Sequence, residues 1–168
     1  IKNNLIENGI EPNQIITKDR SELDLTNQAE VLSFFRESKI DYVILAAAKV
    51  GGISANYNFP AEFIYENLMI QSNIIFASKK NNIQELLFLG SSCIYPRTEN
   101  SKLKEEHLLS AKLEKTNEPY AIAKIAGWKP KIDLVNGLQE TYKDFLTYNW
   151  SMSTSKKNIA LITGITGQ

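Results

Sequence analysis

Residues 42–52 read Tyr-Val-Ile-Leu-Ala-Ala-Ala-Lys-Val-Gly-Gly, and this stretch decides the fold class. Its first half is an unbroken apolar run of strand length, which is typical of a buried strand in a parallel sheet. Its second half is rich in small residues, as expected where a flat cofactor or its phosphates approach the backbone at the end of a strand. Taken alone, the second half fits a tightly packed loop equally well.

Strand and helix patterns alternate on both sides of this stretch. Short β-prone runs occupy residues 14–17 and 86–89, and helical patterns begin at Asn27, Pro60 and Pro119. A cap residue or a proline at the first position is a typical helix start. The alternation predicts an α/β fold, namely a Rossmann-like parallel sheet with helices on both faces.

Length and composition exclude several classes of protein. The 168 residues contain nineteen Lys and Arg and nineteen Asp and Glu, so there is no basic excess for nucleic acid or an anionic membrane surface. No apolar run reaches the ~18 residues that a membrane helix needs. With one Cys and one His, we expect neither an intrachain disulfide nor a metal site. We find no signal-peptide pattern and expect a cytoplasmic protein.

The strongest local motif is Tyr120-Ala-Ile-Ala-Lys124, in the helix that Pro119 opens. A Tyr and a Lys four residues apart lie on the same face of a helix. A nearby ammonium group favours the phenolate and lowers a tyrosine pKa from its usual value of about 10 toward neutrality. The motif therefore predicts an acid–base pair, although the same spacing also describes an ordinary surface pair.

A second motif, Leu-Gly-Ser-Ser-Cys-Ile-Tyr-Pro at residues 89–96, follows a predicted parallel strand. Ligands of open α/β sheets bind beyond the carboxyl ends of the strands. A serine there can hydrogen-bond a substrate oxygen that it shares with Tyr120, and Cys93 can donate a proton. A lone Cys is more often a small buried apolar residue. Its pairing with the Tyr/Lys helix favours the functional interpretation.

A third motif, Lys18-Asp19-Arg20, follows the first predicted strand. At this place in a Rossmann unit an acid binds the ribose of NAD, or an arginine binds the 2′-phosphate of NADP. Since the chain offers both charges, the motif alone does not choose between the two cofactors, and a solvated charged turn is equally compatible with it.

Together these segments resemble the extended short-chain dehydrogenase/reductases and, among them, the GDP-L-fucose synthase family. The match runs from about Arg20 through Gly127 and is carried by residues 45–75, 86–96 and 116–127. The resemblance implies an NADP-dependent epimerase and reductase that converts GDP-4-keto-6-deoxy-D-mannose to GDP-L-fucose. Carbons 3 and 5 of the sugar would be epimerised, and NADPH would then reduce the ketone.

The resemblance also implies the roles of individual residues. The catalytic residues would be Ser91, Tyr120 and Lys124 for reduction and Cys93 as the acid/base of epimerisation. Tyr120 would protonate the carbon-4 oxygen, while Lys124 would hold the nicotinamide ribose and lower the Tyr120 pKa. The NADP(H)-binding positions would be Arg20 at the 2′-phosphate, Asp24 and Leu25 at the adenine, Leu89, Gly90, Ser91 and Ser92 on the nicotinamide side, and Lys124.

The order of segments is unusual for this family. We expect residues 1–127 to be a partial NADP-binding domain, 128–149 to be the family's C-terminal helix and 150–157 to be a linker. Residues 158–168, Asn-Ile-Ala-Leu-Ile-Thr-Gly-Ile-Thr-Gly-Gln, resemble the first Rossmann strand and turn of GDP-mannose 4,6-dehydratases. No such strand or GxxGxxG turn precedes Arg20, and most of the sugar-binding domain is missing from the pattern.

Two expectations follow from this order. The strand in 158–168 should insert in parallel at the vacant central position beside the strand at 14–17, because an unpaired central strand edge is costly. NADPH binding should be weak, because the turn stops before the helix whose N-terminus would hold the pyrophosphate.

The resemblance further implies a GDP-sugar substrate and, in the complete enzyme, a homodimer through the helix at 60–80 and the helix around Tyr120. The apolar face of the first helix would include Phe63, Ile64, Leu68 and Ile75. The alternative is a non-catalytic, truncated or composite fragment that serves as a binding module. A dehydratase is disfavoured, because Ser-Cys stands where dehydratases need an acid/base pair.

Overall fold

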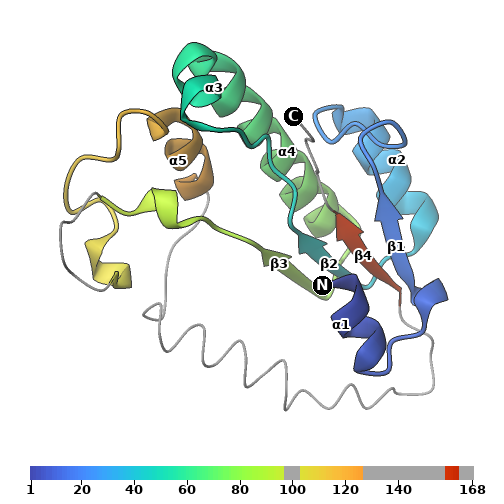
Figure 1. Cartoon of the computed structure of the whole chain (residues 1–168). Helices are drawn as coiled ribbons and strands as arrows, with labels where there is room; N and C mark the ends of the chain where they lie inside the picture. The colour runs from blue at the N-terminus through green and yellow to red at the C-terminus, as the bar shows by residue number, and fades with distance from the viewer. Residues whose placement is uncertain (97–102, 127–157, 163–168) are drawn as a thin grey trace. The chain divides into compact units, whose positions relative to one another are not determined.

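The computed structural model describes residues 1–96, 103–126 and 158–162 (Figure 1). These residues fall into two compact units. The first unit contains all four strands, β1 (Ile15–Lys18), β2 (Tyr42–Leu45), β3 (Glu85–Phe88) and β4 (Ile159–Ile162). It also contains α1 (Lys2–Glu7), the 3-10 turn η1 (Pro12–Gln14), α2 (Gln28–Ser38) and most of α4 (Pro60–Lys80).

The second unit is mainly helical in its described part. It contains α3 (Ile53–Asn58), the first residues of α4, the 3-10 turns η2 (Ser92–Ile94) and η3 (Glu105–His107), and α5 (Glu118–Ile125). The motifs around Ser91 and Tyr120 both belong to this unit, and η2 packs directly on α5.

The four strands form a parallel sheet in the order β1-β4-β2-β3, which confirms the predicted fold class (Figure 1). The connection from β1 through α2 to β2 skips one strand position, and β4 fills it. Ala160 pairs with Ile16 on one side and with Val43 on the other. The predicted insertion of the tail strand at the central position is therefore confirmed.

Hydrogen bonds fix β4 at both of its ends. At the start, the Asn158 backbone N–H donates to Asp41 Oδ2 across 2.7 Å, and the Asp41 N–H donates to the Asn158 carbonyl across 2.9 Å. At the end, the Ala46 N–H donates to the Ile162 carbonyl across 2.9 Å. These bonds satisfy the inner edge of β2, which would otherwise carry unpaired backbone groups.

The main core lies between one face of the sheet and helices α2 and α4. Side chains that share a register position form rows across the strands, and the helices pack on these rows. The sheet contributes Ile16, Ala160, Val43 and Leu86 in one row and Ile162, Leu45 and Phe88 in the next, and the helices contribute Val31, Phe35, Ile70, Ile74 and Ala77. All four residues of β4 are buried, as a central strand requires.

The helices begin where their start signals predict. Asn27 caps α2, since its side-chain oxygen accepts hydrogen bonds from the backbone N–H groups of Ala29 and Glu30. In return, Glu30 accepts from the Asn27 amide across 2.7 Å. Pro60 is the first residue of α4, and α5 begins one residue before Pro119. Within the described residues, no helix is long and apolar enough to cross a membrane.

The apolar dimer face expected on α4 is wrong at Phe63. This side chain is only 2% exposed and belongs to the interior, whereas Ile75 is 39% exposed, as a surface residue of that face would be. Two aromatic residues that the prediction omitted, Tyr65 and Phe76, are exposed instead. The expected helix at 128–149 and linker at 150–157 lie outside the described residues and remain predictions.

Candidate proton-transfer site

Ser91 connects the two predicted catalytic motifs. It has an extended backbone after β3 and caps the short turn η2, so that its Oγ accepts a hydrogen bond from the Cys93 N–H across 3.3 Å. The Ser91 side chain also hydrogen-bonds with the Tyr120 hydroxyl. One serine hydroxyl therefore fixes the backbone of Cys93 and contacts the phenol of Tyr120.

Tyr120 lies in the first turns of α5, and its phenol is partly buried. Burial raises the Tyr120 pKa above its usual value of about 10; the hydrogen bond with Ser91 opposes this effect, and the charge of Cys93 adds to it. The expected lowering of the Tyr120 pKa by Lys124 is therefore not seen. The physical reason is that desolvation of the phenolate outweighs the groups that stabilise it.

Lys124 follows Tyr120 by one helical turn and is only 5% exposed. Its Nζ lies 5.9 Å from the centroid of the Tyr120 ring. Burial lowers the Lys124 pKa from 10.5 to about 8, because the ammonium loses hydration. Since this pKa is still above neutrality, Lys124 is mostly a cation at pH 7 and supplies positive charge beside the phenol.

Asn117 is a site residue that the sequence interpretation missed. It occupies the N-cap position of α5, and its Nδ2 donates a hydrogen bond to the Cys93 sulfur across 3.2 Å. Its Oδ1 is buried, with no hydrogen-bond partner among the described residues. Its position one turn before Tyr120, on the same side of the helix start, was the available signal.

Together these side chains can transfer protons to and from a ligand. The hydroxyls of Ser91 and Tyr120 and the thiol of Cys93 carry exchangeable protons, and Lys124 supplies a positive charge. A carbonyl oxygen placed against the two hydroxyls would accept hydrogen bonds as negative charge develops on it, and the thiol can exchange a proton with a neighbouring carbon.

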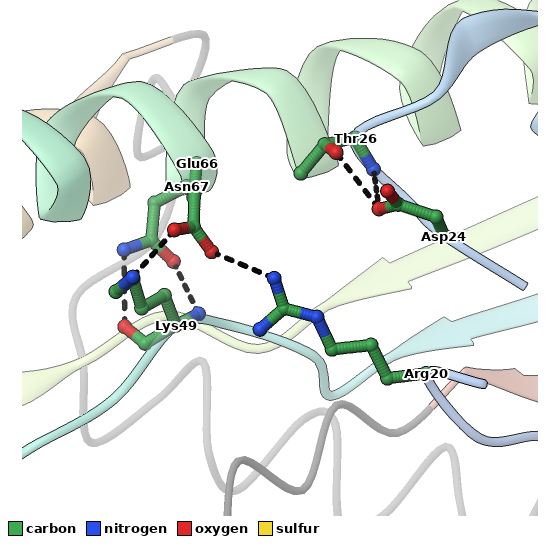
Figure 2. A network of polar contacts seen from close by, with 6 residues as sticks. All are labelled: Arg20, Asp24, Thr26, Lys49, Glu66 and Asn67. Atoms are coloured by element: carbon green, nitrogen blue, oxygen red, sulfur yellow. Dashed lines mark hydrogen bonds and ion pairs between the residues drawn. The ribbon is translucent and has the colours of Figure 1, made fainter.

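The residues predicted to bind the adenosine half of a cofactor lie in the first unit (Figure 2). The Arg20 side chain is 60% exposed and forms an ion pair with Glu66 across 3.3 Å. Asp24 Oδ1 accepts hydrogen bonds from the Thr26 hydroxyl across 2.8 Å and the Thr26 N–H across 2.9 Å, and these bonds lower the Asp24 pKa. Arg20 is thus accessible to an anion, whereas Asp24 shapes the turn before α2.

The remaining predicted cofactor positions differ in their surroundings. Leu25 is partly buried against the core, and its carbonyl accepts a hydrogen bond from Asn73 across 2.9 Å. The Leu89 N–H donates to the Leu45 carbonyl across 3.1 Å, which extends the pairing of β3 with β2. Gly90 and Ser92 are exposed. Leu25 therefore offers a ligand less surface than expected, while Gly90 and Ser92 are accessible.

Comparison with known proteins gives a consistent family assignment. The NAD dependent epimerase/dehydratase family matches residues 4–130. GDP-L-fucose synthase of Escherichia coli is 55% identical over 116 residues, which make up 69% of this chain and 36% of the relative. GDP-L-fucose synthase 1 of Arabidopsis thaliana is 57% identical over 115 residues, 68% of this chain and 36% of the relative. The chain thus spans about a third of the length of these relatives.

A solved structure agrees with the sequence relatives. The GDP-mannoheptose C4 reductase from Campylobacter jejuni, determined with NADP bound, has a TM-score of 0.69 and 38% sequence identity. The similarity covers 96% of this chain and 45% of the reductase.

Proposed function

Because the chain belongs to the NAD dependent epimerase/dehydratase family, we propose that it carries the proton-transfer centre of an NADP-dependent GDP-L-fucose synthase. The proposed substrate is GDP-4-keto-6-deoxy-D-mannose. The observation that carries the proposal is the contact of Ser91 with both Tyr120 and the backbone of Cys93. The identity to relatives named GDP-L-fucose synthase across these motifs supports the choice of substrate.

In the reduction, Tyr120 protonates the carbon-4 oxygen of the sugar, and Ser91 holds that oxygen with its hydroxyl. Loss of the Tyr120 proton leaves a phenolate, which the Ser91 hydroxyl and the charge of Lys124 stabilise. The raised pKa of Tyr120 keeps the phenol protonated before the reaction, so it is ready to act as an acid.

In the epimerisation, Cys93 transfers protons at carbons 3 and 5 on one face of the sugar. Inversion also needs a second acid/base on the opposite face, which the complete enzyme would supply. Both carbons adjoin the carbon-4 ketone, so removal of either proton places negative charge on the carbon-4 oxygen. The hydroxyls of Ser91 and Tyr120 stabilise this enolate by hydrogen bonding. One oxygen-binding pair therefore serves both half-reactions, with Cys93 acting on the carbons and Tyr120 on the oxygen.

Arg20 in the first unit is suited to bind the 2′-phosphate of NADPH. Arg20 presents an exposed guanidinium just beyond the carboxyl end of β1, where a Rossmann fold binds the 2′-phosphate. When bound, NADPH supplies the hydride that reduces the ketone.

The proposal includes two properties of the complete enzyme. It is cytoplasmic, in keeping with a GDP-sugar substrate and a single free cysteine. It is a homodimer through the exposed side of α4, where Tyr65 and Phe76 present aromatic surface. For this chain we further propose a partial NADP-binding domain at 1–127, a C-terminal helix of the family at 128–149, a linker at 150–157 and a strand segment at 158–168.

A chimeric enzyme tests the proposed function. The matching 116 residues of the Escherichia coli relative are replaced by the segment of this chain, and NADPH oxidation is followed with GDP-4-keto-6-deoxy-D-mannose. We expect the chimera to turn over and to release GDP-L-fucose. A folded chimera that binds the GDP-sugar but neither exchanges protons nor oxidises NADPH would overturn the assignment.

A further inference from the structure

Glu66 on α4 lies between two cations, Arg20 and Lys49, which come from the segments that follow β1 and β2 (Figure 2). Its Oε2 pairs with Arg20 Nη2 across 3.3 Å, and its Oε1 pairs with Lys49 Nζ at close range. Arg20 follows β1 and Lys49 follows β2, and all three residues belong to the first unit. The cluster therefore has two positive charges and one negative charge.

The two ion pairs are unequal. The side chains of Lys49 and Glu66 are 24% and 18% exposed, whereas that of Arg20 is 60% exposed. A pair that is largely shielded from water is held more firmly than an exposed one, which contributes little. Lys49 is thus the main counter-ion of Glu66, and Arg20 makes the weaker contact.

The backbone that carries Lys49 is fixed by the residue next to Glu66. The Lys49 N–H donates to Asn67 Oδ1 across 2.9 Å, and Asn67 Nδ2 donates to the Lys49 carbonyl across 3.0 Å (Figure 2). Asn67 is 2% exposed. Since Asn67 and Glu66 are consecutive on α4, the same helix turn positions both the backbone and the ammonium of Lys49.

We infer that Lys49 determines the preference for a 2′-phosphate by neutralising Glu66, so that the charge of Arg20 remains available to the phosphate. This inference rests on the proposed NADP-dependent function. Without Lys49, the Glu66 carboxylate would hold Arg20 more strongly and would repel the 2′-phosphate of the cofactor. Lys49 acts here as a positioning residue that works through Glu66.

The guanidinium has enough donors for both partners. Only Nη2 of Arg20 contacts Glu66, while a guanidinium carries further N–H groups on its other two nitrogens. A two-point contact with a phosphate uses Nη2 and one of the two other nitrogens, and Nη2 keeps a second N–H for it beside the one that Glu66 accepts. Glu66 therefore orients Arg20 as long as Lys49 balances its charge, and becomes a competitor of the phosphate when Lys49 is lost.

The test is a binding titration of the full 168-residue chain with 2′,5′-ADP and with 5′-AMP, which differ by the phosphate in question. Amide NMR spectra report weak affinity up to millimolar ligand and also report the fold of each variant. We expect the wild-type chain to prefer 2′,5′-ADP. Lys49→Met should reduce this preference on the order of tenfold, because a like charge left uncompensated in a binding site disfavours a charged ligand. Lys80→Met, at the exposed end of α4, is the matched control and should keep it.

The double variant Lys49→Met/Glu66→Gln separates the possible mechanisms. We expect it to recover the preference, because the uncompensated carboxylate is gone. Failure to recover would mean that Lys49 contacts the phosphate directly, which overturns the inference. A preference that survives Lys49→Met overturns it as well and leaves the proposed function intact. If the wild-type chain shows no preference at all, the assignment of Arg20 to the 2′-phosphate is wrong, and the inference falls with it.

Discussion

The Asn117 side chain donates a hydrogen bond to the sulfur of Cys93 across 3.2 Å. The two residues lie on different segments, Asn117 at the start of α5 and Cys93 in the turn after β3. A donor aimed at a sulfur stabilises its thiolate form more than its thiol form, because the bond is stronger to an anion. Asn117 therefore links the start of the Tyr/Lys helix to the group proposed to exchange protons with carbon.

This contact predicts the reactivity of the only cysteine in the chain. Asn117→Ala should slow alkylation of Cys93 by iodoacetamide at pH 7 several-fold, equivalent to about 1 kcal/mol for a lost hydrogen bond. The rate is measured by mass spectrometry of the intact chain. Asn58→Ala, on the exposed side of α3, is the control and should alkylate like the wild type. Equal rates for the Asn117 variant and the wild type would show that the contact does not activate the thiol.

Lys124 predicts a pH dependence of stability. In the unfolded chain its pKa is about 10.5 and in the folded chain about 8, so between these values the unfolded state binds more protons. The free energy of unfolding should therefore rise with pH across this window, and the cost of the buried charge should be fully present below pH 8. The shift corresponds to about 3 kcal/mol at most.

Lys124→Met removes this charge while keeping an unbranched side chain. We expect the variant to be more stable than the wild type near pH 7 and to lose the rise in stability above pH 8. Urea unfolding at several pH values measures both effects, with Lys112→Met at an exposed position as the control. Parallel stability curves for wild type and Lys124→Met would contradict the lowered pKa.

The two half-reactions should respond differently to substitution in the chimeric enzyme. Tyr120→Phe should reduce NADPH oxidation on the order of 10²–10⁴-fold, because the proton donor to the carbon-4 oxygen is lost. Cys93→Ser should chiefly slow solvent-deuterium exchange at carbons 3 and 5, because an alcohol is a much weaker acid than a thiol. Exchange is followed by NMR of the sugar. Equal loss of both activities in both variants would refute the division of roles.

The position of β4 predicts a strong effect of truncating its side chains. Ile162 is 2% exposed and packs in the core with Leu45. Ile162→Ala should lower the free energy of unfolding by about 2–4 kcal/mol, from lost burial and the cavity left behind. Leu87→Ala on β3, where the side chain is 44% exposed, should cost much less. Similar urea midpoints for the two variants would place β4 outside the core.

Features governed by the backbone were predictable from the sequence. Asn27 and Pro60 mark helix starts because only certain residues satisfy or tolerate the free N–H groups of a first turn. The central place of β4 followed from a similar argument, since a missing strand leaves backbone groups without partners. The grouping of Ser91 and Tyr120 in one site followed from motif position and resemblance.

Features governed by side-chain environment were not predictable in the same way. The bond between Asn117 and Cys93 depends on how α5 packs on η2, which no periodicity encodes. The raised Tyr120 pKa depends on how deeply the phenol is buried, and spacing to Lys124 says nothing about burial. The pairing of Glu66 with Arg20 and Lys49 joins three segments that are far apart in the sequence.

The central position of β4 also sets the order in which this sheet can be assembled. On the ribosome, β1, β2 and β3 emerge long before β4, yet β4 pairs with both β1 and β2. Until β4 has been synthesised, the edges of β1 and β2 that will pair with it have unpaired backbone N–H and C=O groups. Closing such a distant contact is entropically slow. These edges therefore need protection while the chain is being synthesised. A sheet whose central strand comes first in the sequence does not have this requirement.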